Sequence, residues 1–398
     1  MFGPPLCEAI MMQSIPKKQI NLGGIRMFSG FKRKLFSASA ILLLCMGLPT
    51  LAVAGAKIKI DDTKFFQIGM GYRGSLTMTE DAATSGTDYS FNPATENMRL
   101  YTVSQVHKNI QVEYNTELNG DAINVLDAVA KLDLGVFDLW VGRQLPPSDR
   151  ANMDGPFYLN AAWAYPMIQS FGNQGQFAGR DDGIAIHGDA NGGKLEWAYG
   201  VFEGLEGGAD QEDNVRHTAS LTYAFDDVEP GFYAGSTYFG AKKITTLNFA
   251  MHHEEDGVGS SATDQGDFTG YSVDALIERT LGNGAVVDLE GAYYDWDTDD
   301  KFDNTITQGD SFFVLASYLM PGKTSIGGIQ GQFQPYTRYQ GYNRDMKNDT
   351  AKTGYTDRIE AGVNYVIDGF NAKVTALWQQ TEDVTTVDRY VLGMQFQL

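Results

Sequence analysis

Apolar and polar residues alternate along most of this chain in segments of about ten residues. In the last segment, residues 390–398, apolar side chains at every second position share one face, and glycine and glutamine are concentrated on the other. In a water-soluble protein this terminal strand would be an apolar edge open to aggregation, whereas in lipid it can close a barrel. The pattern therefore favours a transmembrane β-barrel of the bacterial outer membrane over a soluble β-sandwich.

The strands can be counted from this alternation. Their centres are expected at 64–78, 96–107, 110–119, 123–133, 136–143, 181–188, 194–203, 215–225, 243–253, 268–279, 285–296, 310–319, 328–341, 356–366, 372–381 and 388–398. Segments of this length suit tilted transmembrane strands. We predict an all-β fold, a 16-stranded antiparallel transmembrane β-barrel, with 14 or 18 strands as alternatives. Residues 226–242 are too long for a tight turn, and 231–239 could form an extra strand.

The connections alternate in length, as they do in outer-membrane barrels. Even-numbered strands end in tight-turn residues, for example at 191–193 and 282–284, which suits periplasmic turns. Odd-numbered strands are followed by longer acidic loops rich in glycine. These outer loops are expected at 79–95, 144–180, 254–267, 297–309 and 342–355. The longest of them, 144–180, is predicted to fold inward and to narrow the lumen.

The N-terminal part of the chain has the features of an export segment. A basic cluster at 32–34 precedes an apolar run at 35–48, and small residues follow. We therefore predict a signal peptide at 27–56, an over-called translation start at 1–26, and a barrel domain at 57–398. The apolar run is too short for the roughly 20 residues that a membrane helix needs.

The charge balance restricts the partners of the chain. The formal net charge is −20 at pH 7. Nucleic acid is excluded as a partner, because binding its phosphates requires an excess of positive charge. An outer-membrane barrel would instead contact membrane lipid and lipopolysaccharide, and small ions or solutes would pass through it.

Strand parity assigns a set of charged side chains to the lumen. The candidate lumen-facing residues are Glu113, Glu117, Asp274, Glu278, Asp288, Glu290, Arg338, Arg358, Glu360, Lys373 and Arg389. Acidic residues outnumber basic ones in this set, and a ring of like charge concentrates counter-ions. The electrostatics of the lumen therefore favour cations or give no strong preference, unless one tight basic constriction overrides them.

The long loop supplies candidates for such a constriction. A 16-stranded barrel encloses a lumen wide enough for a water channel, so an inward-folded loop is needed to narrow it. The candidate constriction residues are Arg143, Asp149, Arg150, Asp154 and Arg180. The alternative interpretation is that these charges lie on an ordinary outer loop.

Several stretches of the chain resemble the phosphate-selective porin O and P family of outer-membrane channels. They are residues 179–204, 139–147, 368–383 and 388–398, and the first of them is the most specific. This resemblance covers most of residues 60–398. It implies a 16-stranded barrel, commonly a homotrimer, through which small anions or other small hydrophilic solutes diffuse passively.

The pore residues that this resemblance implies are only partly present. Named members of the family select phosphate through rows of arginine and a lysine cluster. Arg143, Arg150 and Arg180 lie in the matching region. The acidic lumen and the scarcity of lysine depart from the family pattern.

Patterns typical of catalysis or metal binding are not evident. The histidines lack metal-ligand spacing, Cys7 and Cys45 both precede the predicted barrel, and the chain has no GxSxG motif. We expect no enzymatic activity, no cofactor and no metal. Two functions remain, a passive diffusion channel and, as the alternative, a structural sleeve for a partner such as a cytochrome in an outer-membrane electron conduit.

Overall fold

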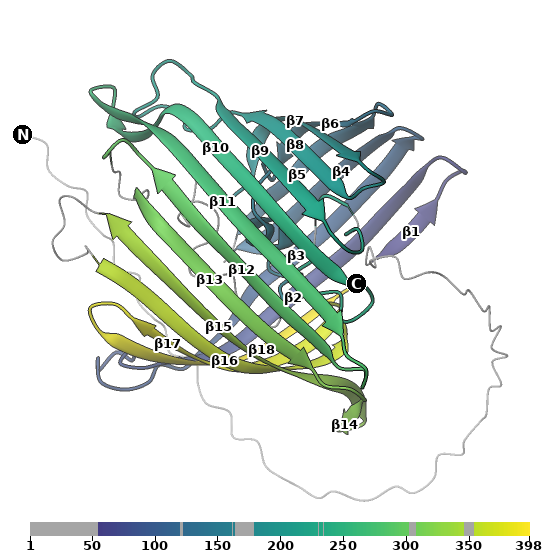
Figure 1. Cartoon of the computed structure of the whole chain (residues 1–398), viewed down its shortest axis with the longest axis vertical. Coiled ribbons are helices and arrows are strands. Elements are labelled where there is room, and N and C mark those ends of the chain that lie inside the picture. Colours follow the sequence, from purple (N-terminus) through teal and green to yellow (C-terminus); the bar gives the residue numbers. More distant parts are fainter. Residues whose placement is uncertain are drawn as a thin grey trace, which may run out of the picture. The chain divides into compact units, whose positions relative to one another are not determined.

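A computed structural model describes residues 55–119, 122–160, 162–163, 179–229, 231–233, 235–301, 308–345 and 354–398. One antiparallel sheet of 18 strands dominates this part of the chain (Figure 1). Within it, no helix is long and apolar enough to cross a membrane. The predicted translation start at 1–26, and nearly all of the predicted signal peptide at 27–56, lie outside the described residues, so both stay predictions.

The wall of the barrel consists of 16 strands. They are β2 Phe65–Thr79, β3 Asn92–His107, β4 Ile110–Asn119, β5 Ala122–Asp133, β6 Asp138–Gln144, β7 Asp181–Ala190, β8 Leu195–Phe202, β9 Arg216–Ala224, β10 Ile244–Ser261, β11 Asp264–Thr280, β12 Val286–Asp297, β13 Gln308–Leu319, β15 Ile329–Asp345, β16 Gly354–Asp368, β17 Ala372–Glu382 and β18 Thr386–Gln397. Each predicted strand centre overlaps one of them, so the predicted 16-stranded barrel is confirmed.

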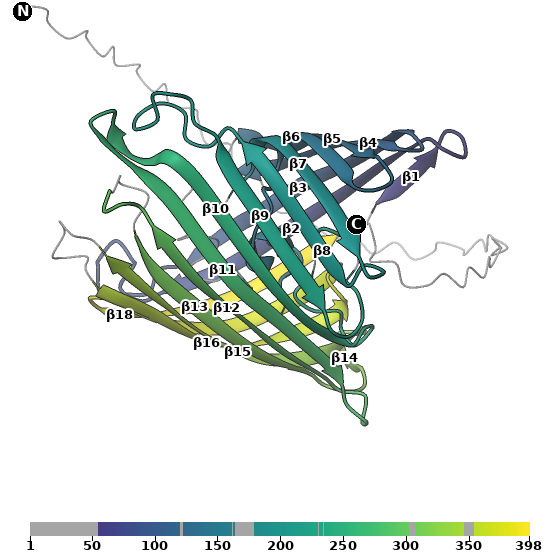
Figure 2. The same cartoon turned by 45° about the horizontal axis from the view of Figure 1, so that its top comes forward.

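The barrel closes because its last strand pairs with its first. β18 runs antiparallel to β2 with Arg389 opposite Thr79 at one end and Gln397 opposite Gly71 at the other. Figures 1 and 2 show the two strands side by side. Two short strands lie outside the 16, β1 Ala56–Lys59 paired with β2 and β14 Thr324–Ile326 paired with β15.

Two predicted connections differ from the structure. No strand forms among the described residues of 226–242, so the alternative of an extra strand at 231–239 is not found there. The segment instead turns into the lumen, where Glu229 and Thr237 are buried. The predicted outer loop 254–267 is mostly strand, because β10 and β11 stay paired until Ser261 faces Asp264.

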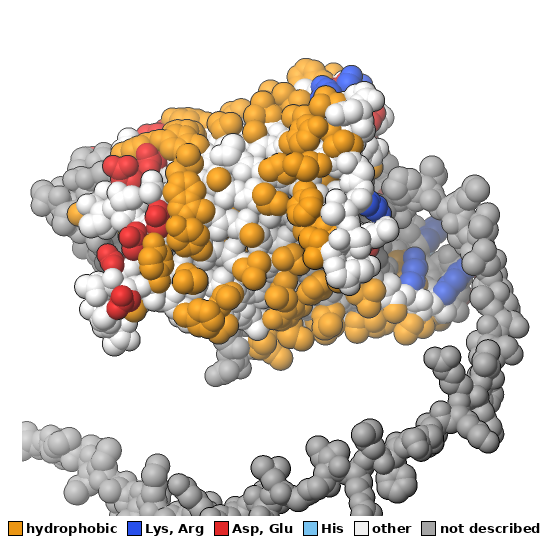
Figure 3. Space-filling view, turned by 90° about the horizontal axis from the view of Figure 1, so that it is seen from below, with side chains coloured by type: hydrophobic (Ala, Val, Ile, Leu, Met, Phe, Trp, Pro, Cys, Tyr) orange, Lys and Arg blue, Asp and Glu red, His pale blue; other side chains and the backbone are white. Residues whose placement is uncertain are grey.

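The outer face of the wall is apolar. Side chains that point outward at alternate positions remain exposed, as Leu289, Ile359 and Leu392 are. Figure 3 shows hydrophobic side chains in bands over the wall, with acidic side chains gathered toward one edge. An apolar belt around a closed barrel is the surface that lipid requires.

The inner face of the wall is polar and mostly buried. Gln334, Asn364 and Thr375 lie on neighbouring strands, none of them is exposed, and they form a hydrogen-bonded row across β15, β16 and β17. These side chains are buried because other parts of the chain fill the lumen.

The outward position of Leu392 gives a test of the membrane-facing belt. Leu392 lies near the middle of β18 and is 47% exposed. We expect Leu392→Arg to lower the free energy of unfolding by about 2–4 kcal/mol, because a cation near the bilayer midplane is poorly solvated. Denaturant unfolding in phospholipid vesicles measures this change. Val384→Arg, in the outer turn, is the control and is expected to cost about 0–1 kcal/mol; equal losses in both variants would contradict the assignment.

Candidate functional site

The loop after β6 turns into the lumen directly beyond the strand. Consecutive prolines at 146 and 147 end the strand, because proline cannot donate to a sheet ladder. The short helix α1 Arg150–Asp154 follows, and the Asp149 carboxylate caps it by accepting a hydrogen bond from the Asn152 amide at 3.2 Å. Gly155, with φ 59°, ends the helix. Every residue of α1 is buried, so this part of the loop lies inside the barrel.

Arg150 anchors α1 to the wall. Its amide donates to the Asp274 carboxylate on β11 at 3.1 Å, and its Nη2 donates to Thr246 Oγ1 on β10 at 2.7 Å. The neighbouring Asp149 carboxylate accepts from the Tyr294 hydroxyl on β12 at 2.8 Å. Three adjacent strands therefore fix the start of the helix.

The loop then crosses to a different part of the wall. Lys373 Nζ on β17 donates to the Leu159 and Asn160 carbonyls at 3.1 and 3.2 Å. On β18, the Gln395 side-chain amide donates to the Phe157 carbonyl at 2.8 Å. The described part of the loop is thus attached at both ends, to β10–β12 and to β17–β18, and spans the lumen between them.

Two wall glycines make room for the aromatic rings of this loop. A Cβ built on Gly71 would lie 2.8 Å from the Phe157 ring, and one on Gly393 would lie 2.6 Å from the Trp163 ring. Trp163 also stacks under the Arg73 guanidinium, 4.1 Å from the ring centroid, and its carbonyl accepts a hydrogen bond from the same arginine. The Phe157 and Trp163 rings therefore pack directly against the wall, at β2 and β18 respectively.

A second segment enters the lumen from the other end of the barrel. This is 225–243, the connection between β9 and β10. The Glu278 carboxylate on β11 accepts hydrogen bonds from the Thr237 hydroxyl at 2.8 Å, the Tyr238 amide at 2.5 Å and the Gly240 amide at 2.8 Å. One buried carboxylate thereby satisfies several donors of a segment that has no sheet partner.

The two inward segments meet at a buried ion pair. Arg150 Nη1 and Nη2 donate to the two Glu229 carboxylate oxygens at 2.7 and 2.6 Å, and each side chain is no more than 5% exposed. A second contact joins the backbones, since the Ser236 amide donates to the Tyr158 carbonyl at 3.1 Å. Because the bidentate pair is shielded from water, each segment holds the other in place.

Charged side chains of opposite sign occupy different sectors of the inner wall. Carboxylates concentrate on β10–β12 and cationic groups on β15–β18 with β2 and β3. The acidic sector contains Glu254, Asp274, Glu278, Asp288 and Glu290, and the basic sector contains Arg73, Arg99, Arg338, Arg358, Lys373 and Arg389. The loop that carries α1 runs between the two sectors, so the field in the lumen has a component across its axis.

The structure places the predicted lumen-facing residues on the inner side of the wall. They alternate with exposed apolar neighbours, as Arg338 does with Tyr339. The set is Glu113, Glu117, Asp274, Glu278, Asp288, Glu290, Arg338, Arg358, Glu360, Lys373 and Arg389. Several of them are paired within the wall, for example Arg338 with Glu360 at 2.7 Å.

The candidate constriction residues are divided between two faces. Asp149, Arg150 and Asp154 lie together in the lumen, and Arg180 pairs with the buried Asp127 on β5 at 3.0 Å. Arg143 shares the outward face of β6 with exposed Val141, and its guanidinium pairs with Asp182 at 3.1 Å. The side-chain parity of β6 therefore separates Arg143 from the other candidates.

Asp154 lacks a partner among the described residues. Its carboxylate is 2% exposed, and neither oxygen accepts a hydrogen bond there. Burial, together with the nearby Glu290 carboxylate, raises the pKa of Asp154 well above its usual range. In the described part of the chain, no group of three or more ligating side chains is arranged to hold a metal ion.

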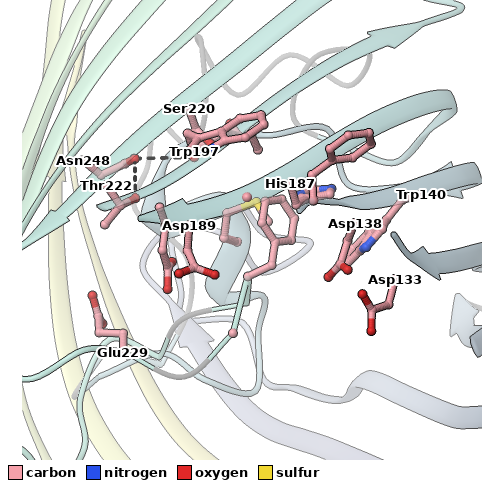
Figure 4. A pocket seen from close by; sticks show the side chains of 18 of the residues that line it. Asp133, Asp138, Trp140, His187, Asp189, Trp197, Ser220, Thr222, Glu229 and Asn248 are labelled. Atoms are coloured by element: carbon pink, nitrogen blue, oxygen red, sulfur yellow. Dashed lines mark hydrogen bonds between the residues drawn. The ribbon is translucent and has the colours of Figure 1, made fainter. Parts of the chain in front are cut away.

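A chamber remains between the wall and the two inward segments. It has a volume of about 470 Å³ and is lined by β5–β10, by α1 with the residues before it, and by the second segment. Figure 4 shows Asp138, Trp140 and His187 on one side of it and Glu229 on another. The turn between β5 and β6 borders it, so it lies at the end of the barrel that carries the short turns.

Sequence reasoning missed the residues of the second segment. Glu229, Thr237 and Tyr238 have no strand periodicity that parity could use. The one indication in the sequence is the length of 226–242, which is greater than a tight turn at that end of the barrel needs. A long connection with Pro230 and Gly231 is typical of a segment that leaves the sheet.

Comparison with solved structures relates this fold to outer-membrane proteins. The trimer form of in-vitro folded OmpT from Vibrio cholerae is 13% identical, with a TM-score of 0.53, over 85% of this chain and 100% of that one. An anion-selective porin from Comamonas acidovorans is 11% identical (TM-score 0.56; 84% and 100%). The outer-membrane channel DcaP of Acinetobacter baumannii is 12% identical (TM-score 0.51; 87% and 100%).

The TM-scores, all above 0.5, establish a shared fold. No family model matches the chain, and no curated protein matches it. The fold is that of porin-like barrels of the bacterial outer membrane, in agreement with the closed wall and its apolar outer belt. The comparisons do not single out the phosphate-selective porin O and P family.

Removing one charge of the Arg150–Glu229 pair is expected to release the second segment. Glu229→Gln removes the bidentate partner of a buried guanidinium and leaves it only the Asp274 carboxylate, 3.7 Å from Nε. Breaking a buried pair in this way costs up to about 3–5 kcal/mol. We expect trypsin to cleave at Lys242 or Lys243 at least tenfold faster while the barrel strands stay intact, as monitored by mass spectrometry. Glu212→Gln, in an exposed outer loop, is the control with the same change of charge. Equal cleavage rates in both variants would refute the bracing role.

Filling the space at Gly393 is expected to displace Trp163 from the wall. Gly393→Val would bring a side chain to within 2.6 Å of the ring, so the indole must move toward water. We expect greater acrylamide quenching of tryptophan emission, and this increase should vanish in a Trp163→Phe background. Gly282→Val, at a position with open space around the Cβ, is the control. An unchanged quenching constant would show that the loop is not docked at β18.

Proposed function

We propose that this protein is an outer-membrane porin, a passive diffusion channel for small hydrophilic solutes and ions. The observation that supports this most directly is a closed 16-stranded barrel with an apolar outer face and a charged inner face. Such a lumen carries water, and inward segments set the size of what passes. The loop that carries α1 and the segment 225–243 are the proposed narrowing elements.

The proposed selectivity is a weak preference for cations. Carboxylates outnumber cations on the inner wall, and the Arg150 guanidinium is neutralised by Glu229. Asp149, Asp154 and Arg180 complete the proposed constriction, and Arg143 is left out of it because of its outward position. We propose a general porin rather than a phosphate-selective one, since the acidic sector on β10–β12 balances the basic sector that contains Arg358 and Arg389.

We further propose that the barrel assembles as a homotrimer in contact with membrane lipid and lipopolysaccharide. The trimer form of the OmpT structure supports this proposal through the shared fold. The alternative of a sleeve around a partner such as a cytochrome has less support, because the chain's own segments occupy the lumen. That the protein has no enzymatic activity and no cofactor stays a prediction.

Planar bilayers test the channel directly. We expect steady single-channel conductance from the purified protein alone, a reversal potential that indicates cation preference, and no block by added phosphate. Arg358→Gln with Arg389→Gln should increase the cation preference. Asp81→Asn with Asp88→Asn changes two charges in an outer loop, of the opposite sign, and as the control should leave the preference unchanged. Anion-selective steps blocked by phosphate would instead support the family that the sequence resembles. Absence of conductance would favour the sleeve.

A further inference from the structure

Two pairs of carboxylates face each other at the short-turn end of the lumen. Asp133 on β5 lies directly opposite Asp138 on β6, and Asp189 on β7 lies directly opposite Glu196 on β8. All four side chains line the chamber. Like charges directly opposite on one face of an antiparallel pair repel each other and destabilise the pairing. The strands therefore hold a negative charge that favours a cation between them.

The basic side chains nearest to these carboxylates are already engaged. Lys131 Nζ lies 2.6 Å from a Glu113 oxygen, and Arg150 is occupied by Glu229. Within the described part of the chain, the carboxylates of Asp138, Asp189 and Glu196 form neither a hydrogen bond nor an ion pair. The chamber lining as a whole contains five carboxylates and one guanidinium. Asp138, Asp189 and Glu196 thus have no direct ion-pair partner in the part of the chain that the structure describes.

His187 is an independent indication of a ligand. It lies opposite Asp138 in register and lines the chamber, it is 9% exposed, and neither ring nitrogen has a hydrogen-bond partner among the described residues. Its ring packs between Trp140, at 4.3 Å between centroids, and Phe232, at 4.2 Å. Figure 4 shows the imidazole between Asp138 and Asp189. A buried imidazole with both nitrogens unmatched is costly, and a donor group on a ligand would satisfy the acceptor nitrogen and remove part of that cost.

We propose that this chamber binds a small organic cation, an amine or guanidinium compound. Its charged head would lie against Asp189 and Glu196 and donate a hydrogen bond to an unprotonated nitrogen of His187, while Phe232 and Trp140 cover its apolar part. A volume of about 470 Å³ suits a molecule of this size. A metal ion is a poorer fit, since no group of three ligating side chains is found in the described residues.

This inference names a class of solute for the channel proposed above and rests on that function for the ligand's route to the chamber. Binding itself does not require conductance. The two can therefore be tested separately, by titration of the purified full chain in detergent and by recording from the same preparation in bilayers.

The first test is isothermal titration with agmatine, an amine that carries a guanidinium group. We expect saturable binding of one agmatine per chain and no binding of succinate at the same ionic strength. Asp189→Asn with Glu196→Gln should lower the affinity at least tenfold. Asp81→Asn with Asp88→Asn, two exposed carboxylates of an outer loop, is the matched control and should keep it. No binding to the unaltered chain, or equal affinities in the two double variants, would overturn the proposal.

The second test uses His187 and does not change the charge of the lining. His187→Phe keeps a packed ring between Trp140 and Phe232 but removes both nitrogens, and we expect it to weaken agmatine binding several-fold while the barrel keeps its heat-dependent gel mobility. Unchanged affinity in this variant would show that the imidazole does not bind the ligand, and it would contradict the proposal.

Bilayer recordings separate this inference from the proposed function. Agmatine added at the short-turn end should reduce conductance at lower concentration than agmatine added at the other end. Binding without any conductance would support the chamber and refute the channel. Conductance without binding or block would support the channel and refute the chamber.

Discussion

The closure of the sheet by β18 and β2 is the constraint on which the rest of the structure depends. In lipid, every backbone amide and carbonyl of the wall needs a partner from the protein, and only a closed ladder supplies one at both edges. Closure fixes which side chains face lipid and which face the lumen. It also encloses a space wide enough for other parts of the chain, and the two inward segments occupy that space.

Buried charge decides how those segments are held. Each attaches through a buried polar side chain that the enclosed lumen shields from water, the Arg150 guanidinium in the first segment and the wall carboxylate Glu278 for the second. Such contacts are strong only when nearly every donor and acceptor is matched. The condition is met at Glu229 and Glu278, and at Arg150 for its two terminal nitrogens. It is unmet at Asp154 and at His187, where a proton or a solute can supply the missing partner.

Prediction from the sequence succeeds where a strand has a regular two-residue alternation of polar and apolar side chains, and it fails where that alternation is absent. Parity placed Arg338 and Glu360 on the inner face because their neighbours are apolar and the strands are regular. Arg143 is a candidate for the constriction only because it lies next to the long loop. The structure places its side chain on the outer face. The inward path of 225–243 could not be derived, because its contacts join residues with no local periodicity.

The sequence by itself determined the architecture. Alternating strands, an apolar terminal strand and short turns at one end leave a closed barrel as the fold that satisfies the backbone in lipid. Only the tertiary structure decided what fills that barrel. The pairing of Arg150 with Glu229, the docking of Trp163 against Gly393 and the chamber around His187 each join residues that are far apart in the chain, and their geometry arises from packing inside a lumen that exists only after closure.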